Sequence, residues 1–477
     1  MKKIRIIPRL DIKGPNVIKG IHLEGLRVVG RPNVLAKKYY EQGADEIIYI
    51  DSVASLYGRD NLLKVIKLAT KDGVFVPMGV GGGIKTIEDI TAILRAGADK
   101  ICINTGAVRN PDLIQQGAEK FGSQCIVLSV EALNIREGKW EVFIENGREE
   151  TGIDAVEWVK KAVGLGAGEI LLTSIDQEGT KKGFDIGLIK EVSSCVSVPI
   201  IASGGAGKIE DIANVLQIPN VDAVAIASML HYNETTIERV KNYLKQNSIN
   251  VRVENKSRFN FDINRNLDKK ISIVDYDIGN LRSVSEAFKF LGCNVKIVNS
   301  KEEIEDSDYL VVPGVGAFGD GINNLKKAGL VDPIKKHAEK GKPILGICLG
   351  AQILMTQSEE FGIHQGLDLI PGEIKKFKSP EEVKELRYRV PHIGWNSIKI
   401  SSKTDDVFKQ IRENTSFYFD HSYFLKPEKS EHFFAKTEYG NQQFASIIRN
   451  DKIIGCQFHP EKSGRFGLKI LEEFCKL

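Results

Sequence analysis

The chain has 477 residues, of which 42% are hydrophobic and 27% are charged, and its formal net charge is +3. That length suits two or three domains, and so small a net charge gives no electrostatic reason to expect nucleic acid or a membrane as a partner. Charged residues come too early in MKKIRIIPRLDIKG for a signal peptide, and no apolar run is long enough to span a bilayer. Seven scattered cysteines without a CxxC pair argue against disulfides or a zinc site. We therefore expect a cytoplasmic protein with neither metal nor cofactor.

Residues 1–253 repeat one pattern, in which a short apolar run rich in β-branched residues is followed by a polar or glycine-rich loop and a helical stretch. Runs that are apolar throughout and separated by helices are typical of parallel strands buried on both faces. Eight such units in about 250 residues predict a (β/α)8 barrel. The runs are IRIIPRLD, EIIYIDS, VFVPMGVGGG, KICINTG, CIVLSVEA, EILLTSID, VPIIASGG and AVAIAS.

Functional residues of such a barrel are expected where the strands end. Strands four apart end alike, so that Asp11 corresponds to Glu131 and Asp51 to Asp176, which indicates a half-barrel repeated twice. Glycine-rich loops expose backbone N–H groups that bind phosphate. Two equivalent loops predict a small-molecule ligand with a phosphate at each end. We call these predicted phosphate sites site 1 (Gly82, Gly83, Asn104, Thr105) and site 2 (Ser203, Gly204, Gly205, Ser228).

Asp11 and Glu131 would face each other between the two sites, which suits a general acid and a general base. The alternative is structural, because glycines after strands also make tight turns and an aspartate at a strand end also caps a helix. That alternative has the most weight for Asp51 and Asp176.

The segments LDIKGPNVIKG, GGGIKTIEDI, GADKICINTGAV, GAGEILLTSID and PIIASGGAGK resemble the cyclase subunits of imidazole glycerol phosphate synthases. The resemblance implies that ammonia and a bis-phosphorylated ribulosyl aminoimidazole carboxamide give imidazole glycerol phosphate and aminoimidazole carboxamide ribotide. It also implies that Asp11 is the general base and that Lys19 lies on a flexible loop over the substrate. Three positions depart from the family pattern: Glu131 replaces an Asp, Glu178 replaces an Asp, and Arg9 replaces a small residue.

Charged residues also stand at the starts of four barrel strands: Arg5, Glu46, Lys100 and Glu169. The resemblance implies that such a ring gates ammonia at the bottom of the barrel. The alternative is a salt-bridge network that closes the barrel floor.

Residues 254–270 are polar and lack periodicity, so they are predicted to be a linker. A second α/β series follows in residues 271–477. ISIVDYD, VKIVNS, YLVVPGVG and PILGIC predict parallel strands, and SFYFDHSYFL, HFFAKTEYG, FASIIRN and IIGCQFHPE predict an antiparallel extension of the same sheet.

The segment ILGICLGAQ ends a predicted strand, and Gly346 and Gly350 flank Cys348 within it, as a nucleophile on a tight strand-to-helix turn requires. The N-terminus of the following helix should lower the pKa of a thiol placed there. His459 and Glu461, in CQFHPEKS, supply a base and a group to orient it. Gly314, Val315 and Gly316, in VVPGVGAFGDG, would direct backbone N–H groups at an oxyanion, unless they form only a turn.

VDYDIGNLRSV, VPGVGAFGD, GICLGAQ, VPHIGWN, DHSYF and GCQFHPEKS resemble class I glutamine amidotransferases, in particular the glutaminase subunit that partners the same cyclase. The resemblance implies that Cys348 attacks the side-chain amide of glutamine and releases ammonia through a glutamyl thioester. It further implies that Gln352, His421, Ser422 and Tyr423 bind or orient glutamine.

We therefore expect a fused imidazole glycerol phosphate synthase whose two domains dock on each other, within the chain or between chains, so that ammonia crosses the barrel. Two alternatives stay open. The first is an ammonia supplier for amidination of a bacterial surface sugar, with the barrel as conduit, which Glu131, Glu178 and Arg9 favour. The second is a phosphate-binding scaffold without barrel catalysis.

Overall fold

The computed structural model describes residues 2–53, 60–253, 263–385, 387–401, 411 and 413–477. They form two compact units. The barrel unit comprises Lys3–Glu254 and Lys384–Pro391, and the sheet unit comprises Met1–Lys2, Asn255–Val383 and His392–Leu477. Part of the predicted linker, 254–262, lies outside the described residues, so the predicted boundaries 1–253, 254–270 and 271–477 stay predictions.

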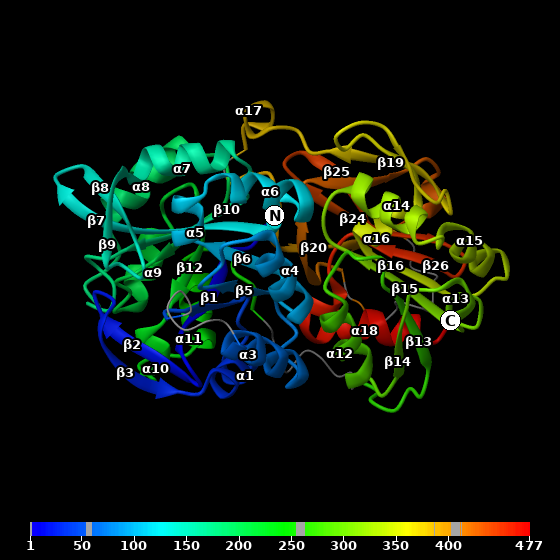
Figure 1. Cartoon of the computed structure of the whole chain (residues 1–477), viewed down its shortest axis with the longest axis horizontal. Helices are drawn as coiled ribbons and strands as arrows, with labels where there is room; N and C mark the ends of the chain where they lie inside the picture. The colour runs from blue at the N-terminus through cyan, green and yellow to red at the C-terminus, as the bar shows by residue number, and fades with distance from the viewer. Residues whose placement is uncertain (1, 54–59, 254–262, 386, 402–410, 412) are drawn as a thin grey trace. The chain divides into compact units, whose positions relative to one another are not determined.

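The barrel unit is a closed ring of eight parallel strands in the order β10-β11-β12-β1-β4-β5-β6-β7, with β7 paired to β10 (Figure 1). All eight predicted strands are present: β1 (Arg5–Lys13), β4 (Ile47–Asp51), β5 (Met78–Gly81), β6 (Lys100–Ile103), β7 (Ile126–Arg136), β10 (Glu169–Ser174), β11 (Ile200–Ser203) and β12 (Val221–Ile226). The predicted (β/α)8 fold is therefore confirmed. Aliphatic side chains such as Ile7, Val127 and Leu171 fill the interior of the ring.

Helices alternate with the barrel strands, as the sequence pattern predicts. They are α1 (Pro32–Glu41), α3 (Asp60–Lys71), α4 (Ile87–Ala96), α5 (Thr105–Arg109), α6 (Asp112–Phe121), η1 (Ser123–Cys125), α7 (Ala155–Gly164), α8 (Ile186–Cys195), α9 (Ile209–Val215), α10 (Ser228–His231) and α11 (Ile237–Gln246). Most of them present apolar residues to the ring at helical spacing. In α4, for example, Ile90, Ile93 and Leu94 are buried, and Thr86 caps the N-terminus by accepting a hydrogen bond from the Asp89 N–H.

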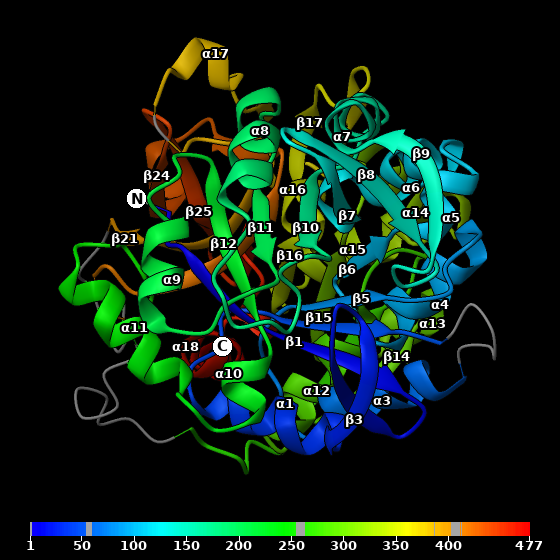
Figure 2. The same ribbon diagram turned by 90° about the vertical axis from the view of Figure 1, so that its left-hand side faces the viewer.

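Two antiparallel hairpins extend the barrel sheet, and the sequence did not predict them. β2 (Asn16–Ile21) and β3 (Glu24–Gly30) follow β1, and β8 (Lys139–Ile144) and β9 (Glu149–Asp154) follow β7. Both hairpins lie at the end of the barrel where the strands finish (Figures 1 and 2). They occur at equivalent places in the two half-barrels, as do the short helices α5 and α10 after β6 and β12, which supports the predicted internal repeat.

The sheet unit has a mixed sheet in which β14 (Asn294–Val298), β13 (Lys270–Val274), β15 (Tyr309–Gly314), β16 (Ile344–Cys348) and β26 (Ile453–Cys456) are parallel. The sheet continues through β25 (Gln442–Asn450), β23 (Tyr423–Pro427), β19 (Ile370–Lys376), β17 (Met355–Ser358) and β18 (His364–Gln365), and β24 (Phe433–Tyr439) and β21 (Lys399–Ile400) lie off this path. Because β25 and β23 run antiparallel to their neighbours, the predicted α/β sheet with an antiparallel extension is confirmed.

The segment SFYFDHSYFL divides between two sheets instead of forming one element. β22 (Ser416–His421) pairs with β20 (His392–Ser397) in a separate ribbon, whereas β23 belongs to the main sheet. The helices of this unit are α12 (Leu281–Phe290), α13 (Lys301–Glu305), α14 (Phe318–Lys327), α15 (Val331–Glu339), α16 (Leu349–Ile353), α17 (Pro380–Val383), η4 (Ser430–His432), η5 (Pro460–Lys462) and α18 (Gly464–Phe474). No helix in the described parts of either unit is long and apolar enough to span a membrane.

Candidate active sites

Cys348 lies at the turn between β16 and α16, and its backbone φ is 52°, in the left-handed region. A non-glycine residue in that conformation is uncommon and strained, as expected of a nucleophile turn. The flanking glycines are required sterically, because a Cβ on Gly350 would lie 1.7 Å from the Val312 carbonyl oxygen and one on Gly346 would lie 2.7 Å from Ala351. The sequence therefore anticipated the local geometry correctly.

His459 and Glu461 form the second part of this site. The Nδ1 of His459 lies 2.9 Å from Oε1 of Glu461, which stands on η5. Burial alone would lower the pKa of His459, but Cys348 and Glu461 together raise that pKa well above its ordinary value. A charged imidazole held between a sulfur and a carboxylate is the arrangement that activates a thiol as a nucleophile.

The predicted oxyanion segment lies beside Cys348 because β15 and β16 are neighbouring parallel strands, with Gly314 directly opposite Cys348. Gly316 has a φ of 116°, which favours glycine. The Tyr276 hydroxyl donates to the Pro313 carbonyl oxygen at 2.6 Å, and it leaves no room for a side chain on Gly314. Tyr276 thus packs against the start of this turn and holds the Pro313 carbonyl group.

The predicted glutamine-binding residues lie on α16, at the end of β22 and at the start of β23. Gln352, on α16, donates to the Tyr423 carbonyl oxygen at 3.0 Å. His421 ends β22, and its Nδ1–H donates to the same carbonyl oxygen at 2.7 Å, while Ser422 joins β22 to β23. Burial lowers the pKa of His421 to about 3, so its ring is neutral. The buried side chains of Gln352 and His421 thus meet at one backbone carbonyl group, and Ser422 and Tyr423 beside them are partly buried.

Gln457 was missed by the sequence analysis, although it belongs to the quoted motif GCQFHPEKS. Its Nε2 lies 3.9 Å from the Cys348 sulfur, and its Oε1 accepts from Gln352 at 3.4 Å. It directly follows β26 and precedes His459 by two positions, so its place within the motif was the signal that the sequence offered.

The four predicted gate residues lie where the barrel strands begin, and they form a closed ring of ion pairs within the barrel unit. Arg5 donates to Glu46 at 2.7 Å and also to Glu169, and Lys100 contacts Glu46 at 3.1 Å and Glu169 at 2.7 Å. All four side chains are buried, so the ring is not a solvated surface network. It crosses the barrel interior where the strands begin.

Asp11 and Glu131 lie where β1 and β7 run on into their hairpins, and their environments differ. Burial would raise the pKa of Asp11, but Arg9, whose Nε donates to Oδ1 at 2.8 Å, and Lys19, at 3.8 Å, hold that pKa below its ordinary value. Burial raises the pKa of Glu131 to about 7, against the lowering effect of Arg9. Near neutral pH one carboxyl is therefore ionised and the other is partly protonated, as an acid–base pair requires.

Site 1 lies at a cavity of about 260 Å³ next to Glu131. Gly82, Gly83, Asn104 and Thr105 all line it, together with the cationic side chains of Lys85 and Arg109. A Cβ on Gly82 would lie 2.5 Å from the Asp51 carbonyl oxygen, so this glycine allows a close backbone approach. The Asn104 side chain donates to Glu131 at 3.1 Å and joins the site to the carboxyl.

Site 2 is different, because its cavity is only about 20 Å³. Ser203, Gly204, Gly205 and Ser228 line it, as predicted, but so do Arg9, Lys19 and Glu178. Lys19 stands on strand β2 and its side chain is buried against Glu178, so this segment is a hairpin, and its predicted flexibility over the substrate stays a prediction. The first loop is a hairpin, and its registry with β1 holds Lys19 in place.

The carboxylates of Asp51 and Asp176 accept backbone hydrogen bonds. The Asp51 carboxylate accepts from Val53 N–H at 3.0 Å and also lines the cavity of site 1. The Asp176 carboxylate accepts from Asn134 N–H at 2.8 Å and fixes the loop region after β7. These contacts add weight to the structural alternative for Asp176. Among the residues that the structure describes, no group of three His, Cys, Asp or Glu side chains is placed to hold a metal ion.

Comparisons with known proteins agree with this division of the chain. A family model described as "Histidine biosynthesis protein" matches residues 5–236, and one described as "Glutamine amidotransferase class-I" matches residues 272–477. The chain is 61% identical over 211 residues to an imidazole glycerol phosphate synthase subunit HisF from Legionella pneumophila, which covers 44% of this chain and 99% of that protein. It is 50% identical over 250 residues to a HisF subunit from Bacillus cereus strain G9842, covering 52% and 98%.

The fold and the sites thus define a fusion of a cyclase-type barrel with a class I glutamine amidotransferase domain. Through its barrel unit the chain belongs to the HisF family of imidazole glycerol phosphate synthase subunits.

Proposed function

We propose that the sheet unit hydrolyses glutamine at Cys348. The thiolate adds to the carboxamide carbon of glutamine, and the N–H groups of the turn at Gly314 to Gly316 stabilise the resulting oxyanion. The C–N bond then breaks, with His459 giving its proton to the leaving ammonia. His459 then takes a proton from water, the hydroxide adds to the thioester carbon, and the C–S bond breaks, which releases glutamate and restores the Cys348 thiolate beside a protonated His459. The observation that carries this proposal is the strained Cys348 turn combined with the 2.9 Å His459–Glu461 contact.

The ammonia would then pass the ring of Arg5, Glu46, Lys100 and Glu169 into the barrel, where an imidazole glycerol phosphate synthase reaction would consume it. The acceptor is the bis-phosphorylated ribulosyl aminoimidazole carboxamide, and the products are imidazole glycerol phosphate and aminoimidazole carboxamide ribotide. Support comes from the opposite protonation of Asp11 and Glu131 near neutral pH, because ring closure needs both a proton donor and a proton acceptor.

A second function is favoured by one contact, the Arg9–Asp11 ion pair at 2.8 Å. An aspartate held by a guanidinium is a weak base, because its proton affinity is lowered. In this case the barrel would be a conduit, and the ammonia would serve amidination of a bacterial surface sugar.

The two candidates separate in one experiment. The purified chain is given the bis-phosphorylated substrate and an ammonium salt without glutamine, and imidazole glycerol phosphate is measured. Turnover supports the synthase. Its absence, while glutamine is still hydrolysed to glutamate, refutes the synthase and supports the ammonia supplier. Loss of glutamine hydrolysis itself would refute the role of Cys348.

A further inference from the structure

Sites 1 and 2 occupy equivalent places in the two half-barrels, so they can be compared position by position. Strand β6 corresponds to β12, and strand β7 corresponds to β1. The pairing of the strands fixes which residues are equivalent: Cys102 on β6 pairs with Val127 on β7, and Ala225 on β12 pairs with Ile7 on β1. Two positions further along each strand are Ser129 on β7 and Arg9 on β1. Ser129 lines the cavity of site 1, and Arg9 lines that of site 2. A small residue in one half-barrel thus corresponds to an arginine in the other.

The cavity volumes differ as this substitution suggests. Site 1 has about 260 Å³, whereas site 2 has about 20 Å³. A volume of roughly 10–15 Å³ holds one water molecule, so site 2 has room for about one. A phosphate group has five heavy atoms and does not fit there without a rearrangement of the lining side chains.

Arg9 is fixed in this position by three separate partners. Its Nε donates to Asp11 at 2.8 Å, and one terminal nitrogen donates to Thr173 at 2.9 Å and to Ser203 at 3.2 Å. Ser203 is itself a residue of site 2, so Arg9 uses a hydroxyl that a phosphate there would need. Arg9 and Asp11 are both buried, and separating buried partners leaves an uncompensated charge.

The β2–β3 hairpin closes the same site from the other side. Lys19 forms a buried ion pair with Glu178, and the His22 N–H donates to the Glu178 carbonyl oxygen at 2.8 Å. The hairpin backbone packs directly on the β10 loop, since a Cβ on Gly179 would lie 2.3 Å from the Gly20 carbonyl oxygen. Each cation that lines site 2 thereby has a carboxylate partner without a ligand: Arg9 pairs with Asp11 and Lys19 with Glu178. The third, Lys181, pairs with Glu234 at the half-exposed rim of the site.

We propose that Arg9 is a specificity-determining residue that fills site 2, so that the barrel binds a ligand through a single phosphate end at site 1. This inference rests on the proposed phosphate-binding role of site 1, and it favours the second candidate function. A bis-phosphorylated molecule would gain no affinity from its second phosphate.

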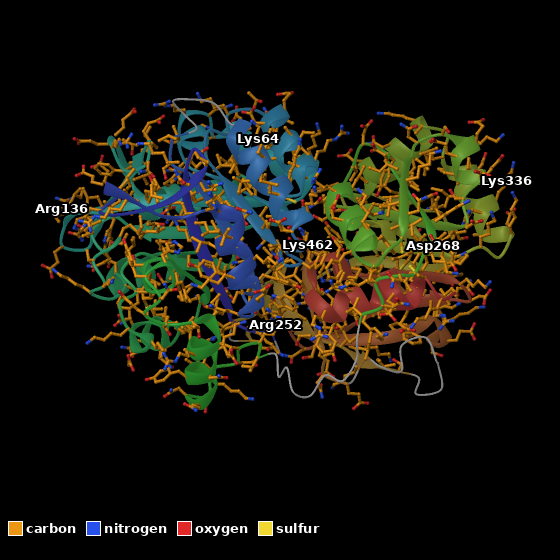
Figure 3. All side chains as sticks on the ribbon, turned by 90° about the horizontal axis from the view of Figure 1, so that it is seen from below. Lys64, Arg136, Arg252, Asp268, Lys336 and Lys462 are labelled. Carbon is orange, nitrogen blue, oxygen red and sulfur yellow. The ribbon has the colours of Figure 1, made fainter. Side chains whose placement is uncertain are left out.

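The test is the number of inorganic phosphate ions that the full-length chain binds, measured by equilibrium dialysis and by calorimetric titration. The wild type should bind one phosphate per chain. Arg9→Ser, which copies the residue at the equivalent position 129, should bind two. The reciprocal change Ser129→Arg should abolish binding at site 1. Arg136→Ser is the matched control, because Arg136 projects from the periphery of the barrel unit (Figure 3), and it should bind one phosphate.

Glutamine hydrolysis by the sheet unit and the urea unfolding midpoint of the barrel unit show that each variant is folded, so a failed fold is not mistaken for lost binding. Two phosphates on the wild type, or one phosphate on folded Arg9→Ser, would overturn the inference. No phosphate on either would show instead that the proposed role of site 1 is wrong, whatever the state of glutamine hydrolysis.

Discussion

Replacing Lys100 by Met should destabilise the barrel unit strongly, because Lys100 supplies one of the two positive charges in the buried ring. Arg5 and Lys100 each contact both Glu46 and Glu169, so charges are balanced two against two. Met fills a similar volume without the charge. The variant leaves two buried carboxylates facing Arg5 alone.

Removing one partner from a buried ion pair costs about 3–5 kcal/mol. Burial opposes ionisation of Glu169, but Arg5 and, after it, Lys100 lower its pKa to about 2 from an ordinary 4.5. This difference corresponds to about 3 kcal/mol at neutral pH, of which Lys100 supplies a part. Because the folded-state pKa is depressed, this stabilisation is present above about pH 4.5 and is lost as the pH falls toward 2. The penalty of Lys100→Met should therefore shrink in acid.

Tryptophan fluorescence can report on the barrel unit alone. Of the three tryptophans, Trp140 and Trp158 are buried in the barrel unit and Trp395 is buried in the sheet unit. Measurements in a Trp395→Phe background follow the barrel in urea. With a slope of about 3 kcal/mol per M, a loss of 3–5 kcal/mol moves the midpoint down by about 1–2 M.

Lys160→Met is the matched control. Lys160 pairs with Glu157 at 2.8 Å on α7, but the two side chains are 46% and 70% exposed, and such pairs contribute little. Its midpoint should match that of the background. A Lys100→Met midpoint within about 0.3 M of the Lys160→Met midpoint would refute the expected destabilisation, because the ring would then contribute no more than an exposed pair.

Three further outcomes follow from the sites. Cys348→Ser should reduce glutamine hydrolysis at least about 10³-fold while leaving any ammonium-dependent barrel reaction intact; residual hydrolysis near wild type contradicts the assigned nucleophile. Glu461→Gln should reduce kcat about 10²–10⁴-fold and shift the pH profile, since His459 loses a group that raises its pKa; a profile equal to that of wild type contradicts this role. The ammonium-dependent rate, corrected for free ammonia, should fall as the pH rises through about 7, where Glu131 loses its proton. In the Glu131→Gln variant this fall in the pH–rate profile should disappear. If the fall persists in the variant, Glu131 is not its source.

The strands of the barrel could be predicted because each contains a run of apolar, mostly β-branched residues that is buried on both faces, with charged residues mainly near its ends. The hairpins β2–β3 and β8–β9 could not, because they carry polar residues such as Lys19 and Glu141 among apolar ones and resemble loops. The buried state of Lys19 depends on Glu178, which lies 159 positions away in the sequence. No local pattern contains that pairing.

The residues around Cys348 were predictable for a different reason. The turn requires glycine at positions 346 and 350, and His459 and Glu461 are two positions apart on one segment, so the geometry is encoded locally. The backbone relations that support them are not local. Gly314 meets Cys348 only because β15 and β16 are neighbours in the sheet.

The three departures from the cyclase pattern look independent in the sequence, but in the structure they differ in consequence. Glu131 stays within reach of Asn104 at 3.1 Å, so the longer side chain is accommodated next to the open site 1. Arg9 and Glu178 instead act together at site 2, where one pairs with Asp11 and the other with Lys19. Restoring an Asp at position 131 would therefore leave site 2 filled, whereas a small residue at position 9 opens it and frees Asp11 from its guanidinium. We therefore expect the acceptor chemistry of the barrel to respond more to a change of Arg9 than to a change in the length of the Glu131 side chain.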